Sequence, residues 1–275
     1  MISLLQALTA LTGRGHPSQQ FTGVDLHCHV LPGLDDGPAT EAESLALCRA
    51  LVADGVHTVV ATPHQLGKME QRYSALDIRQ AVTYLRTRLQ LANIPLEVLP
   101  GAEVRIHEGL PGLIHEDEVL TLADRGRWVL IELPRLSYIE PLPLIRQLKD
   151  AGIRSIIAHP ERHVCVQTHP HVIRGWIEAG ACIQVTATSL LDRLEEEAYR
   201  CAWRMVAEVG AVLIASDAHD ADRRRPRLSE AFRAVALRMG ERVARRVCID
   251  HPADVLAGQA LRPVFETPAR REASR

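Results

Sequence analysis

The sequence lacks a strong charge of either sign and lacks a long apolar run. Its formal net charge is -2 and its isoelectric point is about 6.7, so we expect neither a nucleic-acid partner nor binding to an anionic membrane surface. A membrane-spanning helix needs about 20 apolar residues, and no segment reaches that length, the apolar start MISLLQALTALTG included. That start also lacks the basic residues that open an export signal. We therefore expect a cytoplasmic protein without membrane insertion.

The sequence also lacks closely spaced cysteine pairs and has few lysines. The six cysteines form no Cys-X-X-Cys pair, which favours reduced thiols over a disulfide framework. None has an arginine six positions later, the spacing that a phosphatase with a cysteine nucleophile needs. The only lysines are Lys68 and Lys149. Neither ends an expected strand, which argues against an amidohydrolase that bridges two ions with a carboxylated lysine.

Apolar stretches of strand length alternate with stretches of helical periodicity from residue 21 onward. The chain has 275 residues, 47% of them hydrophobic, which is enough for a substantial core. Seven apolar strands separated by helices predict parallel connections, hence an α/β barrel or a doubly wound sheet. We expect one domain over 21–266, a short helix and linker at 1–20, and a disordered tail at 267–275. The expected strands are Val24–Cys28, Thr58–Ala61, Leu96–Gly101, Trp128–Leu133, Ser155–Ala158, Cys182–Val185 and Val212–Ala215.

The stretch VDLHCHVLPGLDDG begins in the first expected strand and holds two histidines and three acids. Alternate residues of a strand share a face, so Asp25, His27 and His29 are expected to point to one side. Asp35 and Asp36 follow closely, although this acidic pair can also simply form a turn before a helix. Such a set suits a metal site better than a hydrophobic core.

Potential metal ligands, together with one arginine, recur where nearly every later strand ends. In an α/β barrel the active site is built at the carboxyl ends of the strands, where these side chains would converge. They are His64, Glu103, Glu132, His159, Arg162, His163, Asp217 and His219. Convergence, rather than any single motif, indicates a metal site.

Single residues of this set also have structural interpretations. Glu103 can pair with an arginine, and His64 can be a core histidine bonded to a backbone carbonyl. Glu132 can be a half-buried acid neutralised by Arg105 or Arg135. Taken together, the set suits two or three divalent ions, because it offers more ligands than one ion binds. Imidazole and carboxylate donors without a thiolate fit Mn²⁺, Fe²⁺ or Zn²⁺.

Seven motifs resemble those of the polymerase and histidinol phosphatase (PHP) superfamily, and most closely its tyrosine phosphatase branch found with bacterial capsule and exopolysaccharide clusters. They are DLHCH, LDDG, ATPH, GAEV, IELP, AHPER and SDAH. The resemblance runs in order from about Asp25 to about His219. It implies a distorted seven-stranded TIM-like (β/α)7 barrel, the PHP fold, with a manganese-dependent site of up to three ions.

The resemblance also implies roles for individual residues. Arg162 of HPER would hold phosphate oxygens, which suits a planar, permanently charged guanidinium. Asp217 or His219 would protonate the leaving oxygen. In the loop QLGKMEQRYS, Arg72 and Tyr73 are candidate substrate-binding residues by their position. The implied metal ligands are His27, His29, Asp36, His64, Glu103, Glu132, His159, Asp217 and His219.

The activity implied by the resemblance is that of a manganese-dependent phosphotyrosine-protein phosphatase, a phosphoric monoester hydrolase in which a metal-bound hydroxide attacks phosphorus. The implied substrate is a phosphorylated tyrosine tail of a bacterial tyrosine kinase that controls capsular or exopolysaccharide synthesis. The chain itself is a further candidate partner, as a homo-oligomer. Two departures from the family pattern are the residues ahead of the first motif and His163, which replaces an aromatic residue.

Two alternatives stay open at this point. A phosphatase for histidinol phosphate or another small phosphomonoester would use the same metal chemistry with a different pocket. A non-catalytic scaffold would bind a kinase or the polysaccharide machinery without turnover. In that case the arginine cluster at 222–227, DRRRPR, is suited to recruit an acidic phosphorylated tail, although it is equally consistent with a solvated loop.

Overall fold

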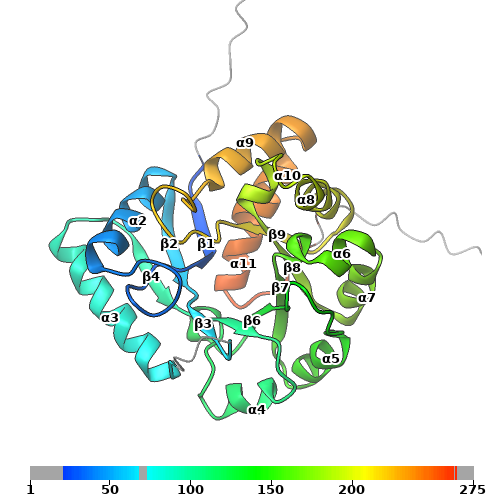
Figure 1. The fold of residues 1–275 in the computed structure, drawn as a ribbon, viewed down its shortest axis with the longest axis horizontal. Coiled ribbons are helices and arrows are strands. Elements are labelled where there is room, and N and C mark those ends of the chain that lie inside the picture. The colour runs from blue at the N-terminus through cyan, green and yellow to red at the C-terminus, as the bar shows by residue number, and fades with distance from the viewer. Residues whose placement is uncertain (1–20, 68–72, 263, 265–275) are drawn as a thin grey trace, which may run out of the picture.

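A computed structural model describes residues 21–67, 73–262 and 264, in which strands and helices alternate along the chain (Figure 1). The strands pair in parallel, so the prediction of an α/β fold with parallel sheets is confirmed. The helix and linker predicted at 1–20 and the tail predicted at 267–275 lie outside the described residues.

All seven predicted strands are present, together with two short strands that the sequence does not predict. They are β1 (Gly23–Cys28), β2 (Val56–Ala61), β3 (His64–Gln65), β4 (Glu97–Pro100), β5 (Glu103–Arg105), β6 (Trp128–Glu132), β7 (Arg154–Ala158), β8 (Cys182–Thr186) and β9 (Val212–Ala215). β3 follows β2 after Pro63, which has no N–H to donate to a sheet. β5 follows β4 after Gly101, where a Cβ atom would lie 2.6 Å from Cγ1 of Val60. Local backbone constraints therefore divide these two segments.

The strands form two sheets, and the chain passes from the first to the second between β2 and β3 and again between β4 and β5. One has the order β1-β2-β4 and the other β3-β5-β6-β7-β8-β9. The chain after β9 also reaches β1, because the Asp217 N–H donates to the His27 carbonyl at 2.8 Å and the His29 N–H donates to the Ala218 carbonyl at 2.9 Å. A closed seven-stranded barrel stays a prediction, since the described strands belong to two separate sheets.

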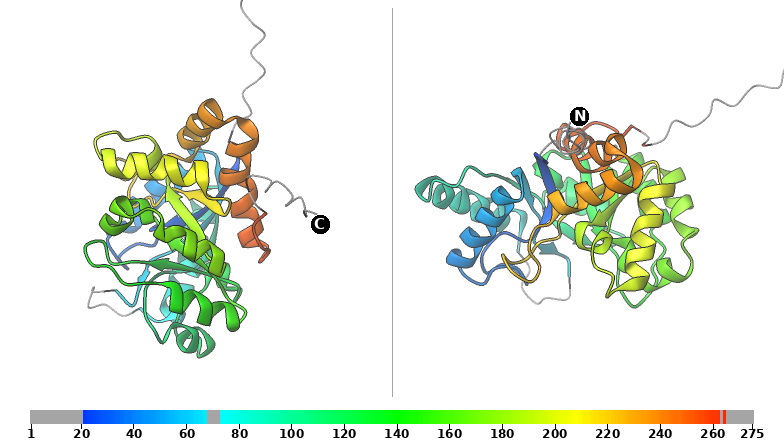
Figure 2. Two further views of the ribbon diagram at one scale, coloured as in Figure 1. Left: turned by 90° about the vertical axis from the view of Figure 1, so that its right-hand side faces the viewer. Right: turned by 90° about the horizontal axis from the view of Figure 1, so that it is seen from above.

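Helices surround the strands (Figures 1 and 2). α2 and α3 begin at capping boxes, formed by Thr40 with Glu43 and by Ser74 with Asp77, a local sequence signal for helix starts. The α-helices are α2 (Glu41–Ala53), α3 (Ala75–Leu91), α4 (Leu110–His115), α5 (Leu142–Asp150), α6 (Val164–Thr168), α7 (Val172–Ala179), α8 (Glu196–Glu208), α9 (Leu228–Met239), α10 (Glu241–Arg245) and α11 (His251–Leu256). The shorter turns are η1 (Leu122–Asp124), η2 (Pro160–Arg162), η3 (Ala187–Leu190) and the π-helical η4 (Arg246–Asp250).

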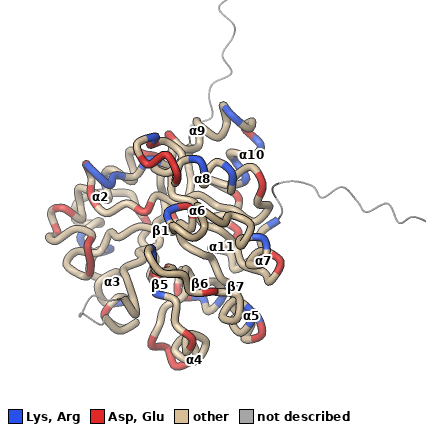
Figure 3. Tube along the Cα trace, turned by 45° about the vertical axis from the view of Figure 1, so that its right-hand side comes forward, with Lys and Arg blue, Asp and Glu red and all other residues tan. Residues whose placement is uncertain are grey.

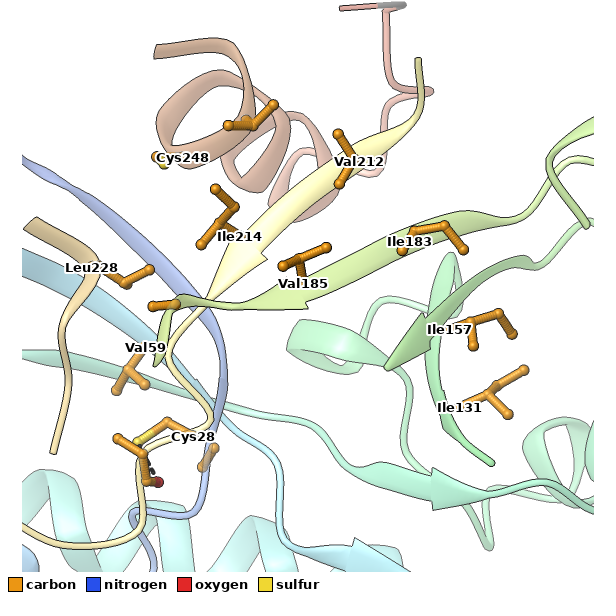
Figure 4. Close-up of a cluster of buried hydrophobic side chains, with 14 of the residues drawn as sticks. Cys28, Val59, Ile131, Ile157, Ile183, Val185, Val212, Ile214, Leu228 and Cys248 are labelled. Carbon is orange, nitrogen blue, oxygen red and sulfur yellow. Dashed lines mark hydrogen bonds between the residues drawn. The ribbon is translucent and has the colours of Figure 1, made fainter. Parts of the chain in front are cut away.

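Two hydrophobic clusters lie on opposite sides of the strands, as a two-residue alternation requires. Leu130 and Ile156 belong to the smaller, inner cluster. Their neighbours Ile131 and Ile157 belong to the larger cluster, which packs against the helices (Figure 4). The same alternation puts Glu132, at the carboxyl end of β6, on the inner side.

The amino ends of the strands are covered by α11. Val255 of this helix packs in the inner cluster with Val24 at the start of β1 and Trp128 at the start of β6. The Trp128 indole N–H donates to the Gln259 carbonyl at 3.1 Å. The opposite, carboxyl ends are therefore the ones available to functional side chains.

The cysteines, the helices and the charged residues of the described ranges bear on the remaining predictions from composition. All six cysteines are free. No helix there is both long and apolar enough to cross a membrane. Basic and acidic residues are interspersed along the chain (Figure 3).

Asp54 joins the end of α2 to the start of α9. Its carboxylate accepts a hydrogen bond from the Leu228 N–H at 2.6 Å and one from the Ser229 hydroxyl at 2.5 Å. We expect Asp54→Ala to lower the free energy of unfolding by about 1–3 kcal/mol, because the donors lose their partner. Urea denaturation measures this loss. The exposed Asp150→Ala serves as control and should change stability by less than about 0.5 kcal/mol; equal effects would contradict the capping role.

Candidate metal centre

Eight of the nine predicted metal ligands lie together at the carboxyl ends of the strands. Their donor atoms form three groups, and the atoms of each group lie within 4.8 Å of one another. The groups are His29, Asp36, His64 and His219; His27, His29 and Asp217; and His27, Glu103 and His159. Their role as metal ligands stays a prediction.

Glu103, which is 1% exposed, lies between four histidines. Its Oε1 is 2.8 Å from Nε2 of His159. Its Oε2 is 3.1 Å from Nδ1 of His64 and 3.3 Å from Nε2 of His27. The same oxygen is 3.4 Å from Nε2 of His29. One buried carboxylate thus gathers imidazoles from β1, β3 and the turn after β7.

Asp36 and Asp217 extend the cluster on either side. Oδ1 of Asp36 lies 3.5 Å from Nε2 of His64 and 3.2 Å from Nε2 of His219. Oδ1 of Asp217 lies 3.4 Å from Nε2 of His27. The Asp36 side chain is 50% exposed and the Asp217 side chain 3%, so the cluster is open to solvent on the Asp36 side.

Gln184, which the sequence-based prediction missed, and Asp35, which it named only as part of an acidic pair, orient the innermost histidines. Nδ1 of His27 lies 3.0 Å from Oε1 of Gln184, and Nδ1 of His29 lies 2.6 Å from Oδ2 of Asp35. An oxygen acceptor at Nδ1 fixes the ring and leaves Nε2 facing the cluster. Both had a sequence signal: Gln184 is polar within the apolar β8, and Asp35 adjoins Asp36.

Asp25 does not join the cluster, although strand alternation predicts that it points with His27 and His29. β1 has an irregular register between Asp25 and Cys28. The buried Asp25 carboxylate instead accepts hydrogen bonds from Ser216, from its N–H at 3.0 Å and from its hydroxyl. Asp25 therefore ties β1 to the chain after β9 rather than facing the other acids.

Two residues of the cluster have a left-handed backbone. The φ angle is +30° at His159 and +53° at Asp217, a conformation that costs a non-glycine residue about 1–2 kcal/mol. Surrounding contacts fix it: the Asp217 N–H binds the His27 carbonyl at 2.8 Å, and the His159 N–H binds Oε1 of Gln184 at 3.3 Å. Strained backbone of this kind gathers at functional sites.

Glu132, the ninth predicted ligand, is not in the three groups. Its Oε2 forms an ion pair with Nη1 of Arg105 at 2.8 Å, the structural alternative that its sequence context allows. Glu132 nevertheless lines the same cavity as His64 and Glu103. Its role as a metal ligand therefore stays a prediction.

The cluster opens into a cavity of about 180 Å³ whose wall carries Arg162 and Arg224. Nη1 of Arg162 lies 2.6 Å from Oδ2 of Asp217, and Nη2 of Arg224 lies 3.2 Å from the same oxygen. Arg162 is the predicted phosphate-binding residue. Arg224 belongs to the arginine cluster at 222–227, and the sequence alone does not distinguish it from its neighbours.

The remaining predicted residues lie at the edge of this site or away from it. The Tyr73 hydroxyl donates to the Gly33 carbonyl at 3.0 Å, and Tyr73 lines a separate pocket beside α3. Arg72 lies outside the described residues. His163 lines the cavity, with Nε2 3.2 Å from the Ser137 carbonyl oxygen. The substrate-binding roles of Arg72 and Tyr73 stay predictions.

The clustered carboxylates change the pKa values of the imidazoles. Burial lowers the pKa of His29, but Asp35 and Glu103 outweigh it and raise that pKa to about 10. Burial also opposes the charged form of His64, whose pKa Asp36 and Glu103 raise to about 11. In turn the imidazoles, against the effect of burial, hold the pKa of Glu103 well below its ordinary value. The surrounding carboxylates therefore favour the protonated forms of His29 and His64.

The donor set fits divalent ions. It consists of imidazole nitrogens and carboxylate oxygens, which suit Mn²⁺, Fe²⁺ or Zn²⁺. Buried carboxylates repel one another unless cations lie between them. Each of the three groups brings donors close enough to share an ion.

Comparison with known proteins places these residues within a family. Residues 23–257 match the model of a family described as "Capsular polysaccharide synthesis, CpsB/CapC". The chain is 35% identical to the tyrosine-protein phosphatase YwqE of Bacillus subtilis over 212 residues, 76% of this chain and 82% of that protein. It is 26% identical to the tyrosine-protein phosphatase CpsB of Streptococcus pneumoniae over 246 residues, 86% of this chain and 100% of that protein.

Solved structures give the same relationship. A structure from a study of YwqE from Bacillus subtilis and CpsB from Streptococcus pneumoniae, "unique metal-dependent tyrosine phosphatases", has a TM-score of 0.83 and 30% identity, over 87% of this chain and 96% of that chain. A β-aspartyl dipeptidase from Fervidobacterium islandicum has a TM-score of 0.51 at 13% identity, over 87% of this chain and 75% of that chain. The dipeptidase shares the fold alone.

We expect metal binding to release protons. His29 and His64, with pKa values raised to about 10 and about 11, are protonated at pH 7 and must lose that proton to coordinate an ion. Titrating the metal-free protein with Mn²⁺ at pH 7 should release roughly one or two protons per site, and affinity should rise between pH 7 and 9. Isothermal titration calorimetry in two buffers of different ionisation enthalpy measures the release. Tight binding without proton release would contradict the protonated state.

The hydrogen bond from His27 to Gln184 leads to a further prediction. Gln184→Leu keeps the side-chain size but removes the acceptor for Nδ1 of His27. We expect Mn²⁺ affinity to fall by about 10- to 100-fold. Gln184→Glu keeps an acceptor oxygen and should bind at least as tightly as the unsubstituted protein. Equal affinities of the two variants would show that Gln184 does not orient His27.

Proposed function

The chain belongs to the CpsB/CapC family of capsular polysaccharide synthesis, and on that premise we propose that it is a metal-dependent phosphatase that hydrolyses phosphotyrosine in proteins. One observation carries the proposal. A cluster of histidines and carboxylates faces a cavity whose wall also holds Arg162 and Arg224. Donors for divalent ions and guanidiniums for phosphate oxygens are the two components that phosphoryl transfer needs.

The proposed architecture is a distorted seven-stranded barrel, the PHP fold. In it β2 and β3 together form one strand, and β4 and β5 another. The hydrogen bonds between β1 and the chain after β9 support this arrangement. It puts every clustered residue at the carboxyl end of the barrel, where active sites of such folds are built.

The proposed cofactor is manganese, with two or three ions held by the three groups of donors and with Fe²⁺ or Zn²⁺ as alternatives. Divalent ions at such a site lower the pKa of bound water and neutralise charge on phosphate oxygens. Glu132 is available as a further ligand once it leaves Arg105, since it lines the same cavity.

Arg162 and Arg224 are proposed to hold the phosphoryl oxygens. Both guanidiniums lie within 3.2 Å of Oδ2 of Asp217, so they already face an anionic oxygen at the cavity wall. A planar guanidinium offers paired N–H donors that match phosphate geometry. The cavity of about 180 Å³ is smaller than the roughly 300–1,000 Å³ of pockets that enclose a whole ligand. Only the phosphoryl end of a side chain enters it, and the rest of the substrate stays outside.

The hydrogen bonds and ion pairs of the two predicted acids, Asp217 and His219, favour a phenolic leaving group. Nδ1 of His219 lies 3.0 Å from the Asp217 carbonyl oxygen and Nε2 lies 3.2 Å from Oδ1 of Asp36. The Asp217 carboxylate faces Arg162 and Arg224. Neither Asp217 nor His219, the predicted acids, has a free donor directed at the cavity. Tyrosine, with a pKa near 10, leaves as phenolate with less need of an acid than an alkyl alcohol, which favours phosphotyrosine over histidinol phosphate or phosphoserine.

The proposed partner is a bacterial tyrosine kinase with a phosphorylated tyrosine tail, acting in capsular or exopolysaccharide synthesis. The family description supports the pathway, and the names of the similar proteins support the substrate class. A cytoplasmic location is part of the proposal, because the six cysteines are free thiols, as a reducing compartment keeps them.

The proposal is tested by phosphate release from metal-stripped protein resupplied with Mn²⁺, using a phosphotyrosine peptide, histidinol phosphate and a phosphoserine peptide. We expect manganese-dependent turnover that favours phosphotyrosine. Arg162→Ala should lower kcat/KM by about 10²–10³, the effect of removing one preorganised donor from a transition state. The control Arg125→Ala changes an exposed arginine at the amino end of β6 and should have no effect.

Other outcomes distinguish the alternatives. A preference for histidinol phosphate would support the proposed metal site but identify the substrate as a small phosphomonoester. Metal binding without turnover of any ester would support the alternative that the protein is a non-catalytic scaffold.

A further inference from the structure

A second hollow of about 590 Å³ adjoins the catalytic cavity. The two share Arg135, Arg162, Asp217 and Arg224 in their walls. Beyond these residues the hollow is lined by the segments 188–195, after β8, and 222–227, after β9. A substrate whose phosphoryl group lies in the cavity therefore has this hollow beside it.

Two guanidiniums in the wall of the hollow have no partner in the part of the chain that the structure describes. The side chains of Arg135 and Arg223 form no hydrogen bond and no ion pair there. By contrast, Arg225 and Arg227 of the same wall both pair with Glu230, at 2.9 Å and 2.6 Å. Six arginines and four carboxylates line the hollow, so its wall carries a net positive charge.

The turn that bears Arg223 is ordered and reaches the catalytic cavity. Oδ1 of Asp220 accepts hydrogen bonds from the N–H groups of Asp222 at 2.7 Å and Arg223 at 2.6 Å. The next residue, Arg224, extends its guanidinium to Asp217. Arg135, on the loop after β6, lines both the cavity and the hollow. Both unpaired arginines thus stand on segments that also form the catalytic wall.

We propose that this hollow binds a second anionic group of the substrate polypeptide, a carboxylate or a further phosphate near the phosphotyrosine. The proposal rests on the phosphatase function proposed above and names the substrates that the site prefers. Because only the phosphoryl end enters the cavity, neighbouring residues of the substrate lie over the adjoining surface. Unpaired guanidiniums bind carboxylate and phosphate oxygens through charge-assisted hydrogen bonds. Arg135 and Arg223 would therefore select acidic sequences around the phosphotyrosine.

The test uses peptides of equal length around one non-hydrolysable phosphotyrosine mimic, bound to the full, Mn²⁺-loaded protein and followed by fluorescence anisotropy. The flanking residues are aspartates in one peptide and asparagines in a second; a third has asparagines and a second phosphotyrosine mimic. We expect either anionic peptide to bind roughly five- to tenfold more tightly than the neutral one, as charge-assisted contacts at a partly exposed site allow. This preference should shrink with added salt. The stronger of the two anionic peptides identifies carboxylate or phosphate as the preferred group.

Substitutions assign the preference to the two arginines. In Arg135→Gln combined with Arg223→Gln, the ratio of anionic to neutral affinity should fall to about one, whereas in Arg125→Gln it should stay as in the unsubstituted protein. Thermal unfolding checks that all variants are folded. Equal binding of all peptides by the unsubstituted protein, or a preference that survives the double substitution, overturns the proposal. Absence of phosphotyrosine turnover, measured separately, would instead refute the proposed function.

Discussion

The buried carboxylate of Glu103 is the group on which the arrangement of the site depends. An ionised carboxylate in a protein interior needs compensating partners, and here four imidazoles lie within 3.4 Å of its oxygens. They can reach it only if β1, β3 and the turn after β7 end at one place. The short strands β3 and β5 meet this requirement directly, because their parallel register puts His64 opposite Glu103. Two short strands thus bring together the middle of the cluster.

Asp217 connects the two halves of the site. Its Oδ1 faces His27 in the metal cluster, and its Oδ2 faces the guanidinium of Arg162. The position of the arginine is therefore set by a residue that also belongs to the cluster. In the proposed function, ion binding and phosphate binding are therefore coupled through one side chain, whose own left-handed backbone is fixed by β1.

The sequence predicts the parts of this structure that follow from local pattern. Runs such as 128–131 are apolar on both faces, as strands of a parallel sheet are, and the carboxyl ends of such strands meet at one face. Contacts between residues that lie far apart in the sequence are harder to predict from it. The choice of Arg105 rather than Arg135 as the partner of Glu132, and the selection of Arg224 from its cluster, depend on register and loop geometry. Strand alternation gives Asp25 the wrong neighbours, because it takes no account of the irregular register in β1.

The contacts between β1 and the chain after β9 have a consequence during synthesis. His27 and Asp217 meet through a backbone hydrogen bond, yet they are 190 residues apart in the sequence. A ribosome adding roughly 5–20 residues per second needs roughly 10–40 seconds to pass from one to the other. Throughout that interval the growing chain carries the DLHCH motif without the carboxylate that completes its surroundings. A chain cut or released before β9 therefore contains the most recognisable motif of the sequence but lacks a completed site to hold an ion.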